Sequence, residues 1–284
     1  MEISTIAFEI GPIVVHWYGL LLVVGTLVGG VVATMEAKRR GEDPEHVWNG
    51  LIWCIILGFL GARLYHILSS PATGTRGFRS YVEDPLTIFQ VWDGGLSIYG
   101  ALAGGVVGVL IYTWRHRLSA WRWLDIGAPG LVLAQAIGRW ANFINQELYG
   151  PPTRLPWGLY IGADHRIPRY ADLNRYPTDT TRFHPTFLYE SLWNLGLFAL
   201  LMWGSRRWAR RLRDGDLFLA YLLLYGVGRL WIEGFFRPDA WALENGLAVG
   251  ALISLALALI AGLALLVRHR RTKDVDATRH DANA

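Results

Sequence analysis

The stretch "GRWANFINQELYG", residues 138–150, places Arg139, Asn142, Asn145 and Glu147 at the end of a long apolar run. A charged side chain inside a membrane-spanning segment costs on the order of 3 kcal/mol or more, so such residues are usually functional. Arginine suits an oxyanion, because its planar guanidinium binds phosphate or carboxylate through two parallel hydrogen bonds and keeps its charge. The asparagines can bind a polyol. The pattern favours recognition of an anionic headgroup.

A second polar stripe is formed by Tyr225, Arg229, Glu233 and Arg237, which recur at every fourth position. This spacing places them on one face of a helix, where Arg229 and Glu233 can pair. Within the first stretch, the same periodicity predicts that Arg139, Asn142 and Gln146 share a face. For any single residue, a structural ion pair between helices is an equally good interpretation. Two arginine-bearing stripes at the same depth favour a binding site.

The segments that carry these residues are predicted to span a membrane. The chain has 284 residues, of which 52% are hydrophobic, and its apolar blocks match the roughly 20 residues that a bilayer core requires. We expect an all-α integral membrane protein with a single domain over residues 1–271. The seven predicted spans are 12–34, 47–68, 94–113, 124–145, 185–204, 216–236 and 244–267.

The basic residues predict the orientation of these spans, because Lys and Arg in short loops stay on the cytoplasmic side. Every second connection is basic, which predicts an outside N-terminus and an inside C-terminus. The start of the chain has no basic residue of the kind that precedes a cleavable signal peptide, so we expect the first helix to be retained. The net charge of +4 then describes the inner membrane face and gives no support for nucleic-acid binding. The basic connections contain Lys38, Arg39 and Arg40; Arg115, Arg117 and Arg122; Arg206, Arg207, Arg210, Arg211 and Arg213; and Arg268, Arg270, Arg271 and Lys273.

Two further segments differ from the spans in composition. The outside connection 146–184 is long and rich in proline and aromatic residues, so we expect a small folded head rather than a disordered loop. The tail 272–284 is polar, and we expect it to be disordered on the inner side.

The polar residues of the predicted spans all fall in the half of the membrane nearer the outside. Helix-packing polar residues would not be expected to choose one leaflet repeatedly, so one outward-facing polar cavity is predicted. Besides the two stripes, the candidates for this cavity are His16, Tyr18, Arg63, Tyr99, His184 and Glu190.

Several other chemistries find no support in the sequence. The sole cysteine, Cys54, lies among apolar residues in mid-span, where it is expected to pack as a small apolar group. The histidines lack metal-ligand spacing, and neither a nucleotide-binding P-loop nor a hydrolase serine motif is present. The stretch "GGVVG" at 104–108 is typical of close helix packing. No metal and no cofactor are expected.

With these segments taken together, the chain resembles the bacterial prolipoprotein diacylglyceryl transferases over nearly its whole length. The resemblance rests on residues 138–150 and, in the same order along the chain, on "HWYGL" (16–20), "GARLYH" (61–66), "GGLSIYGALAGG" (94–105), "HPTFLYES" (184–191) and "YGVGRLWIEGFFRPD" (225–239). It implies a seven-helix fold with a periplasmic head between the fourth and fifth helices, located in the bacterial inner membrane.

The resemblance also implies the reaction and its participants. Members of the family move diacylglycerol from phosphatidylglycerol to the lipobox cysteine of a prolipoprotein signal peptide, which forms a thioether and releases glycerol phosphate. The family's functional residues fall on Arg139, Asn142, Glu147, Tyr18, Tyr225, Arg229 and Glu233, and Asn145 and Gly150 complete the matched pattern of the signature.

One position departs from the family pattern, because Tyr99 stands where many members have a histidine that has been proposed as the base for the thiol. A tyrosine is a poor base at neutral pH, since its ordinary pKa is about 10. His16 and His184 titrate in a better range. We expect Tyr99 to position substrate while the arginines lower the pKa of the thiol. Glu190 either holds an arginine or contacts substrate.

Two functions of other classes are the alternatives. A transporter of a small organic anion would use the arginine stripes as its binding site, but alternating access usually involves internal repeats and a site near the midplane. A non-catalytic membrane scaffold would explain the helices and leave the polar residues of one leaflet unexplained.

Overall fold

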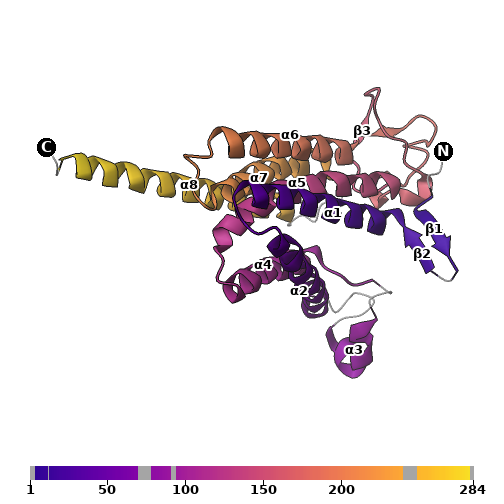
Figure 1. Cartoon of the computed structure of the whole chain (residues 1–284). Coiled ribbons are helices and arrows are strands. Elements are labelled where there is room, and N and C mark those ends of the chain that lie inside the picture. Colours follow the sequence, from indigo (N-terminus) through magenta and orange to yellow (C-terminus); the bar gives the residue numbers. More distant parts are fainter. Residues whose placement is uncertain (1–3, 12, 70–77, 91–93, 239–247, 282–284) are drawn as a thin grey trace. The chain divides into compact units, whose positions relative to one another are not determined.

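The computed structural model describes residues 4–11, 13–69, 78–90, 94–238 and 248–281, which form a mainly helical chain (Figure 1). Within these residues there are eight α-helices, short 3-10 helices and two small two-stranded sheets. The chain divides into two compact units, which are described separately. Unit 1 comprises Met1–Val32 and Gly127–Ala284, and unit 2 comprises Ala33–Ile126.

Unit 2 is built on α2 (Glu45–Ser69) and α4 (Ile98–Arg115), which pack against each other along small residues. A Cβ atom added at Gly104 would collide with the backbone of Leu57, and one at Gly108 would lie 2.9 Å from the Cα atom of Cys54. Glycine therefore lets the two backbones approach, as small residues do in membrane helix pairs. The predicted packing role of "GGVVG" is confirmed.

Unit 2 also contains α3 (Phe78–Glu83) and a 3-10 helix, η1 (Pro85–Phe89), between α2 and α4. Asp84 begins η1 by accepting a hydrogen bond from the backbone N–H of Leu86 (3.3 Å), which satisfies one of the free donors at a helix start.

Unit 1 contains the first part of α1 (Trp17–Arg39), most of α5 (Ala120–Ile144), and α6 (Thr186–Arg207), α7 (Asp216–Phe236) and α8 (Val249–Asp281). Helix α7 packs against both α6 and α8. A core cluster joins α5, α6 and α7, and Tyr221 within it accepts a hydrogen bond from Gln135 (2.9 Å). The buried residues of this cluster are Ala128, Val132, Leu197, Leu201, Leu217 and Tyr221.

Within the part of the chain that the structure describes, five helices are long and apolar enough to cross a membrane, which makes the chain an integral membrane protein of the multi-pass type. They are Trp17–Arg39, Glu45–Ser69, Ile98–Arg115, Asp216–Phe236 and Val249–Arg270. Helices α5 and α6 have 25 and 22 residues and are thus as long as the five candidate spans. Their hydropathy is lower because they contain polar side chains such as Arg139, Asn142, Glu190 and Asn194. Their membrane crossing, and so the number of seven spans, stays a prediction.

The structure corrects the predicted limits of two helices. Residues 13–16 form strand β2 instead of the first turns of a helix, because a turn at Gly11 (φ +58°) and three β-branched residues favour a hairpin. Helix α8 runs to Asp281, so residues 272–281 have helical backbone where a disordered tail was predicted. After Gly262 no glycine or proline stops the helix. Residues 244–247 of the last predicted span lie outside the described residues.

The head segment, residues 146–184, has a small core of its own that contains Tyr149, Ile161, Tyr170 and Phe183. Two short strands, β3 (Pro152–Thr153) and β4 (Arg182–Phe183), pair in antiparallel fashion. The other regular elements of this segment are the 3-10 helices η3 (Ala163–His165) and η4 (Pro168–Tyr170).

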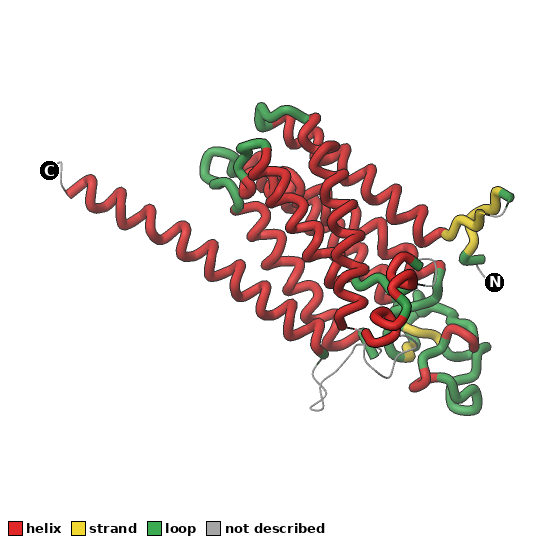
Figure 2. Tube along the Cα trace, turned by 90° about the horizontal axis from the view of Figure 1, so that it is seen from below, coloured by secondary structure: helices red, strands yellow, loops and turns green. Residues whose placement is uncertain are grey.

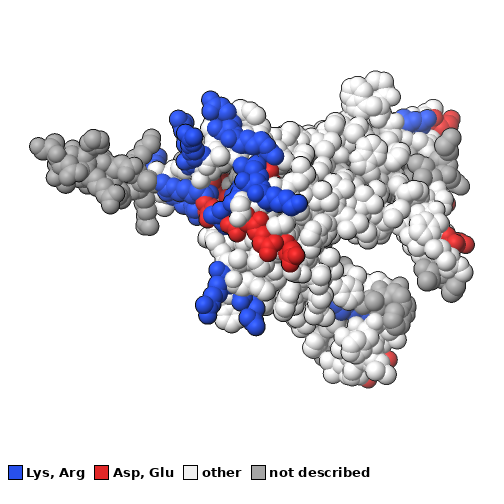
Figure 3. Space-filling model, viewed as in Figure 1, with Lys and Arg blue, Asp and Glu red and all other residues white. Residues whose placement is uncertain are grey.

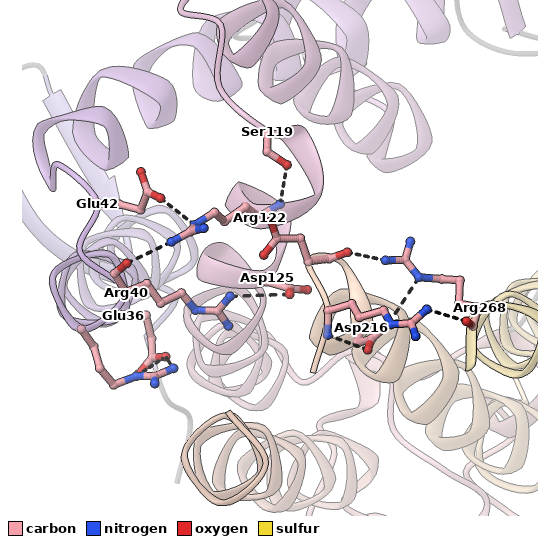
Figure 4. A network of polar contacts seen from close by, with 11 residues as sticks. Glu36, Arg40, Glu42, Ser119, Arg122, Asp125, Asp216 and Arg268 are labelled. Carbon is pink, nitrogen blue, oxygen red and sulfur yellow. Dashed lines mark hydrogen bonds and ion pairs between the residues drawn. The ribbon is translucent and has the colours of Figure 1, made fainter. Parts of the chain in front are cut away.

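Lys and Arg side chains of unit 1 gather where α6 ends, α7 begins and α8 extends away (Figure 3). There, the buried Asp216 contacts Arg268 (3.4 Å) and His269 (2.9 Å). Unit 2 has similar contacts, in which Arg122 pairs with Glu42 (2.6 Å) and Arg40 with the buried Asp125 (3.6 Å). Figure 4 shows these two pairs and the pair of Asp216 with Arg268. These carboxylates balance part of the positive charge that the sequence concentrates in the basic connections.

Candidate functional site

The centre of the candidate site is the carboxylate of Glu190, which receives an arginine from each of two other helices. One of its oxygens, Oε2, lies 2.7 Å from Nη2 of Arg139 on α5 and 2.7 Å from Nη1 of Arg229 on α7. Glu190 itself belongs to the first turns of α6, where its side chain is 3% exposed. Three helices of unit 1 therefore converge on one buried anion, and the sequence interpretation that Glu190 holds an arginine agrees with these contacts.

The stripe on α7 extends the cluster. Glu233 forms an ion pair with Arg229 one turn away, as the four-residue spacing predicts, and lies 3.9 Å from the guanidinium of Arg237. The five side chains joined by these contacts comprise three arginines and two glutamates. Two guanidinium groups that converge on one oxygen atom form an arrangement that also suits a phosphate or carboxylate oxyanion.

The end of α5 positions the polar residues that follow Arg139. The backbone N–H of Glu147 donates to the Asn142 carbonyl (3.0 Å), and the N–H of Gln146 donates to the Phe143 carbonyl (3.2 Å). These two bonds define a Schellman motif, in which the residue after the helix takes a left-handed conformation. Gln146 holds that position with φ +52°, although glycine is the usual residue there.

This turn brings Glu147 back over the last turn of the helix. Its Oε1 atom accepts hydrogen bonds from the side-chain amides of Asn142 (2.8 Å) and Asn145 (3.4 Å), while Oδ1 of Asn142 accepts from Arg139 (3.4 Å). A continuous chain of hydrogen bonds thus leads from Glu147 to Arg139. Asn142 is held in one orientation, because its oxygen faces a donor and its nitrogen faces a carboxylate.

The helix ending corrects one prediction. Gln146 does not share the helix face of Arg139 and Asn142, because α5 ends at Ile144. The side chain of Gln146 instead accepts a hydrogen bond from the backbone N–H of Gly162 (2.7 Å) in the head segment. Gln146 therefore fastens the head to the end of α5.

Gly150 and His184 lie where the head returns to α6. The N–H of Gly150 donates to the carbonyl of His184 (2.9 Å), and a Cβ atom at Gly150 would lie 2.7 Å from the Cβ atom of His184. A larger residue at position 150 would push this junction apart, which is the physical reason for a glycine there.

The imidazole of His184 pairs with Tyr189, which the sequence places with His184 and Glu190 in the predicted cavity without giving it a role. Nδ1 of His184 lies 3.0 Å from the hydroxyl of Tyr189, and this hydroxyl also accepts from the indole N–H of Trp157 (3.3 Å). The Tyr189 proton is then available to Nδ1, an arrangement that favours the neutral imidazole with its proton on Nε2. Burial also favours the neutral imidazole, because it lowers the pKa of His184.

A narrow space adjoins the arginine cluster between α6 and α7. It has no room even for a water molecule, so a phospholipid headgroup does not fit there in this arrangement of the helices. Sequence reasoning missed Trp193 and Asn194, although the spacing of three and four residues after Glu190 places them on the same face of α6. The residues around this space are Glu190, Trp193, Asn194, Tyr225, Gly228, Arg229 and Ile232.

Two predicted site residues of unit 1 lie at the start of α1. Tyr18 is in the first turn of the helix, His16 is the last residue of β2, and both are exposed. Neither residue takes part in the ion pairs that the structure describes around Glu190.

Arg63 and Tyr99 belong to unit 2. The guanidinium of Arg63 is buried and donates only to backbone carbonyls in the hydrogen bonds that the structure describes, among them those of Thr87 (2.7 Å) and Ile88 (2.8 Å). Tyr99 lies in the first turn of α4, and its ring is exposed and 6.1 Å from that of Tyr65. Arg63 therefore orders the loop that leads into the helix of Tyr99.

Comparison with known proteins gives one consistent result. Residues 5–268 match the family described as prolipoprotein diacylglyceryl transferase. A protein of Chloroflexus aggregans named phosphatidylglycerol–prolipoprotein diacylglyceryl transferase is 41% identical over 274 residues, which cover 92% of this chain and 87% of the relative. Proteins of the same name from Trichormus variabilis and a Nostoc species are 41% and 42% identical over 279 residues, which cover 96% of this chain and 93% of each relative.

Proposed function

Because the chain belongs to the prolipoprotein diacylglyceryl transferase family, we propose that it transfers the diacylglyceryl group of phosphatidylglycerol to the cysteine thiol of a prolipoprotein. The observation that carries this proposal is the convergence of Arg139 and Arg229 on the single carboxylate oxygen of Glu190. Such a pair of guanidinium groups is suited to a phosphodiester.

The proposed reaction is a displacement at carbon. The sulfur of the prolipoprotein cysteine attacks glycerol C3 of the lipid and forms a C–S bond, while the C3–O bond breaks. Its electron pair goes to the phosphate oxygen, so glycerol phosphate leaves, and the thiol loses its proton. The chain needs no nucleophile of its own. Negative charge grows on the departing phosphate, which is where fixed positive charge lowers the barrier.

Arg139 and Arg229 would supply that charge. In the present conformation Glu190 occupies the place between them, and the adjoining space is too small for a headgroup. We therefore propose that the lipid phosphate approaches the two guanidinium groups as the helices α6 and α7 separate there, with Glu190 remaining bound to one of them. Asn142 and Glu147 would hold the glycerol hydroxyls, since both are already oriented by the hydrogen bonds at the end of α5.

The proton acceptor for the thiol is a separate part of the proposal. We propose that Tyr99 positions the substrates and that the arginines favour the thiolate by their charge. His184 is a weaker candidate for a base, because the contact of its Nδ1 with Tyr189 favours a proton on Nε2. Full activity of Tyr99→Phe together with loss of activity in a folded His184→Ala variant would assign the base to His184 instead.

The proposal also includes the setting of the enzyme. We propose seven membrane spans over residues 1–271, an N-terminus and a head segment on the periplasmic side of the bacterial inner membrane, and a cytoplasmic C-terminus. The lipobox of the prolipoprotein signal peptide would then reach the site from the side of the head. These features are supported by the charge pattern of the connections and by the five long apolar helices.

The test uses purified protein in detergent with phosphatidylglycerol and a lipobox peptide, and it follows the release of glycerol phosphate. Release should require the cysteine of the peptide, and Arg139→Ala and Arg229→Ala should each lower the rate by about 10²–10³. Arg210→Ala, a change of an exposed arginine beyond the end of α6, serves as the matched control and should keep the rate. Release that is unaffected by either site variant would refute the assignment of the two arginines.

A further inference from the structure

A β-hairpin precedes the first membrane helix and is attached directly to it. Strands β1 (Ile6–Ile10) and β2 (Ile13–His16) pair in antiparallel fashion, and α1 begins at the next residue, Trp17. The backbone N–H of Trp17 donates to the carbonyl of Thr5 (3.0 Å), so the hairpin is fastened to the helix through both strands. Figure 2 shows the hairpin standing clear of the head segment.

One face of this hairpin is apolar and uncovered. Because successive residues of a strand point to opposite faces, Phe8 and Ile10 share one face of β1, and Val15 lies opposite Phe8 on that face. The exposed fractions of Phe8 and Ile10 are 45% and 64%, so no part of the chain that the structure describes buries them. Glu9 and its cross-strand partner Val14 occupy the other face. In water, an apolar sheet face would pack on a core.

The exposed apolar surface continues from the hairpin onto α1. Leu22, Val23 and Leu27 are exposed on this helix, which is one of the five candidate membrane spans. Trp17 and Tyr18 stand exposed at the junction of hairpin and helix, and such aromatic residues collect at the boundary between lipid tails and water. Exposed apolar side chains thus extend from the hairpin onto a helix that is long and apolar enough to cross a membrane.

We propose that the hairpin is an interfacial membrane anchor, which lies on the leaflet at which α1 begins and turns Phe8 and Ile10 into the lipid. Glu9 lies on the opposite strand face, which is turned to water. Interfacial segments of this kind sit about 5–10 Å into the boundary between headgroups and acyl chains. The anchor fixes the depth in the membrane of His16, the last residue of the hairpin, and of Tyr18 in the first turn of α1. This inference concerns lipid contact and does not rest on the proposed function.

The test measures lipid contact with a nitroxide label on single cysteines. Cys54, the sole cysteine, is first changed to alanine, and cysteine is then introduced as Ile10→Cys or, for the opposite face, Glu9→Cys. Each labelled protein is reconstituted into vesicles of phosphatidylglycerol and phosphatidylethanolamine. Accessibility to oxygen, which concentrates in lipid, is compared with accessibility to a water-soluble nickel chelate by paramagnetic resonance. Leu27→Cys in α1 and Asp164→Cys in the head give the lipid and water references.

We expect the ratio of oxygen to nickel accessibility at position 10 to be several-fold higher than at position 9 and closer to that of position 27. A label at position 10 that favours the nickel chelate as strongly as position 164 would overturn the proposal. Low accessibility to both reagents would also overturn it, because it would mean that protein covers this face. A lipid-like ratio at position 27 in the same preparation verifies that the helix is inserted.

Discussion

Replacing Glu190 with glutamine should destabilise the protein by about 3 kcal/mol, because one buried carboxylate balances two guanidinium groups. Breaking a buried ion pair by removal of one partner costs ~3–5 kcal/mol, and the lower end applies because Arg139 and Arg229 keep exposed fractions of 20% and 16%. Glutamine has the same shape and can still accept a hydrogen bond, so the change isolates the loss of charge. Arg229 retains Glu233, whereas Arg139 retains the longer 3.4 Å contact with Asn142.

Thermal unfolding in detergent, without lipid substrate, measures this effect. A loss of about 3 kcal/mol corresponds to a fall in Tm of roughly 6–12 °C at ~2–4 °C per kcal/mol for large domains. The matched control is Glu83→Gln at the exposed end of α3, for which the change in stability should stay within about 0.5 kcal/mol.

A double-mutant cycle separates the ion pair from other effects of the substitution. In a protein that already carries Arg139→Gln, the Glu190→Gln change should cost less stability than it does alone, because the guanidinium of Arg139 is no longer left without its partner. For residues in contact, the expected coupling energy is ~0.5–3 kcal/mol. Strict additivity of the two changes, or a loss below about 1 kcal/mol in Glu190→Gln, would refute the reasoning that this carboxylate holds the two arginines together.

Three further predictions concern other parts of the molecule. Gly95→Ala should cost about 1–3 kcal/mol in thermal unfolding, because Gly95 has φ +82° and an added Cβ would lie 2.6 Å from Arg63; an unchanged Tm would show that the loop adjusts. Burial lowers the pKa of His184 below its ordinary 6.5. As the pH falls below 6.5, the unfolded chain therefore takes up a proton at His184 before the folded chain does. The stability that is present above pH 6.5 should then decline below pH 6.5. His184→Phe should show a smaller decline in Tm between pH 7.5 and 5.5, and an equal decline would assign it to other groups. Asp216→Asn should weaken the contact with His269 and destabilise the packing of the C-terminal part of α8 by ~1–3 kcal/mol. Trypsin should then cleave this part of α8 faster than in the unchanged protein, and equal cleavage rates would contradict the prediction.

Sequence alone was sufficient for features that depend on local periodicity. The limits of α7 were predicted without error, because a mainly apolar block of bilayer length begins and ends there, and the Arg229–Glu233 pair followed from the four-residue spacing. The family was also predicted from residues that remain in order along the chain, and the comparisons confirm it. The start of α1 was predicted wrongly, because apolar content does not distinguish a helix from the β-branched strand that precedes it.

Tertiary structure decided which of these residues meet. Glu190 and Arg139 are 51 positions apart in sequence, yet helix packing places their charged atoms 2.7 Å apart, and no periodicity in the chain predicts that contact. The backbone turn at Gln146 likewise directs the side-chain amide of Gln146 toward the head segment. In unit 2, the fold places backbone carbonyl groups around the guanidinium of Arg63. The sequence by itself determined the long apolar helices, the polar stripe of α7 and the family, since these depend on neighbouring residues. The partner of each buried charge was decided by packing, because only the folded chain brings distant helices within hydrogen-bond distance.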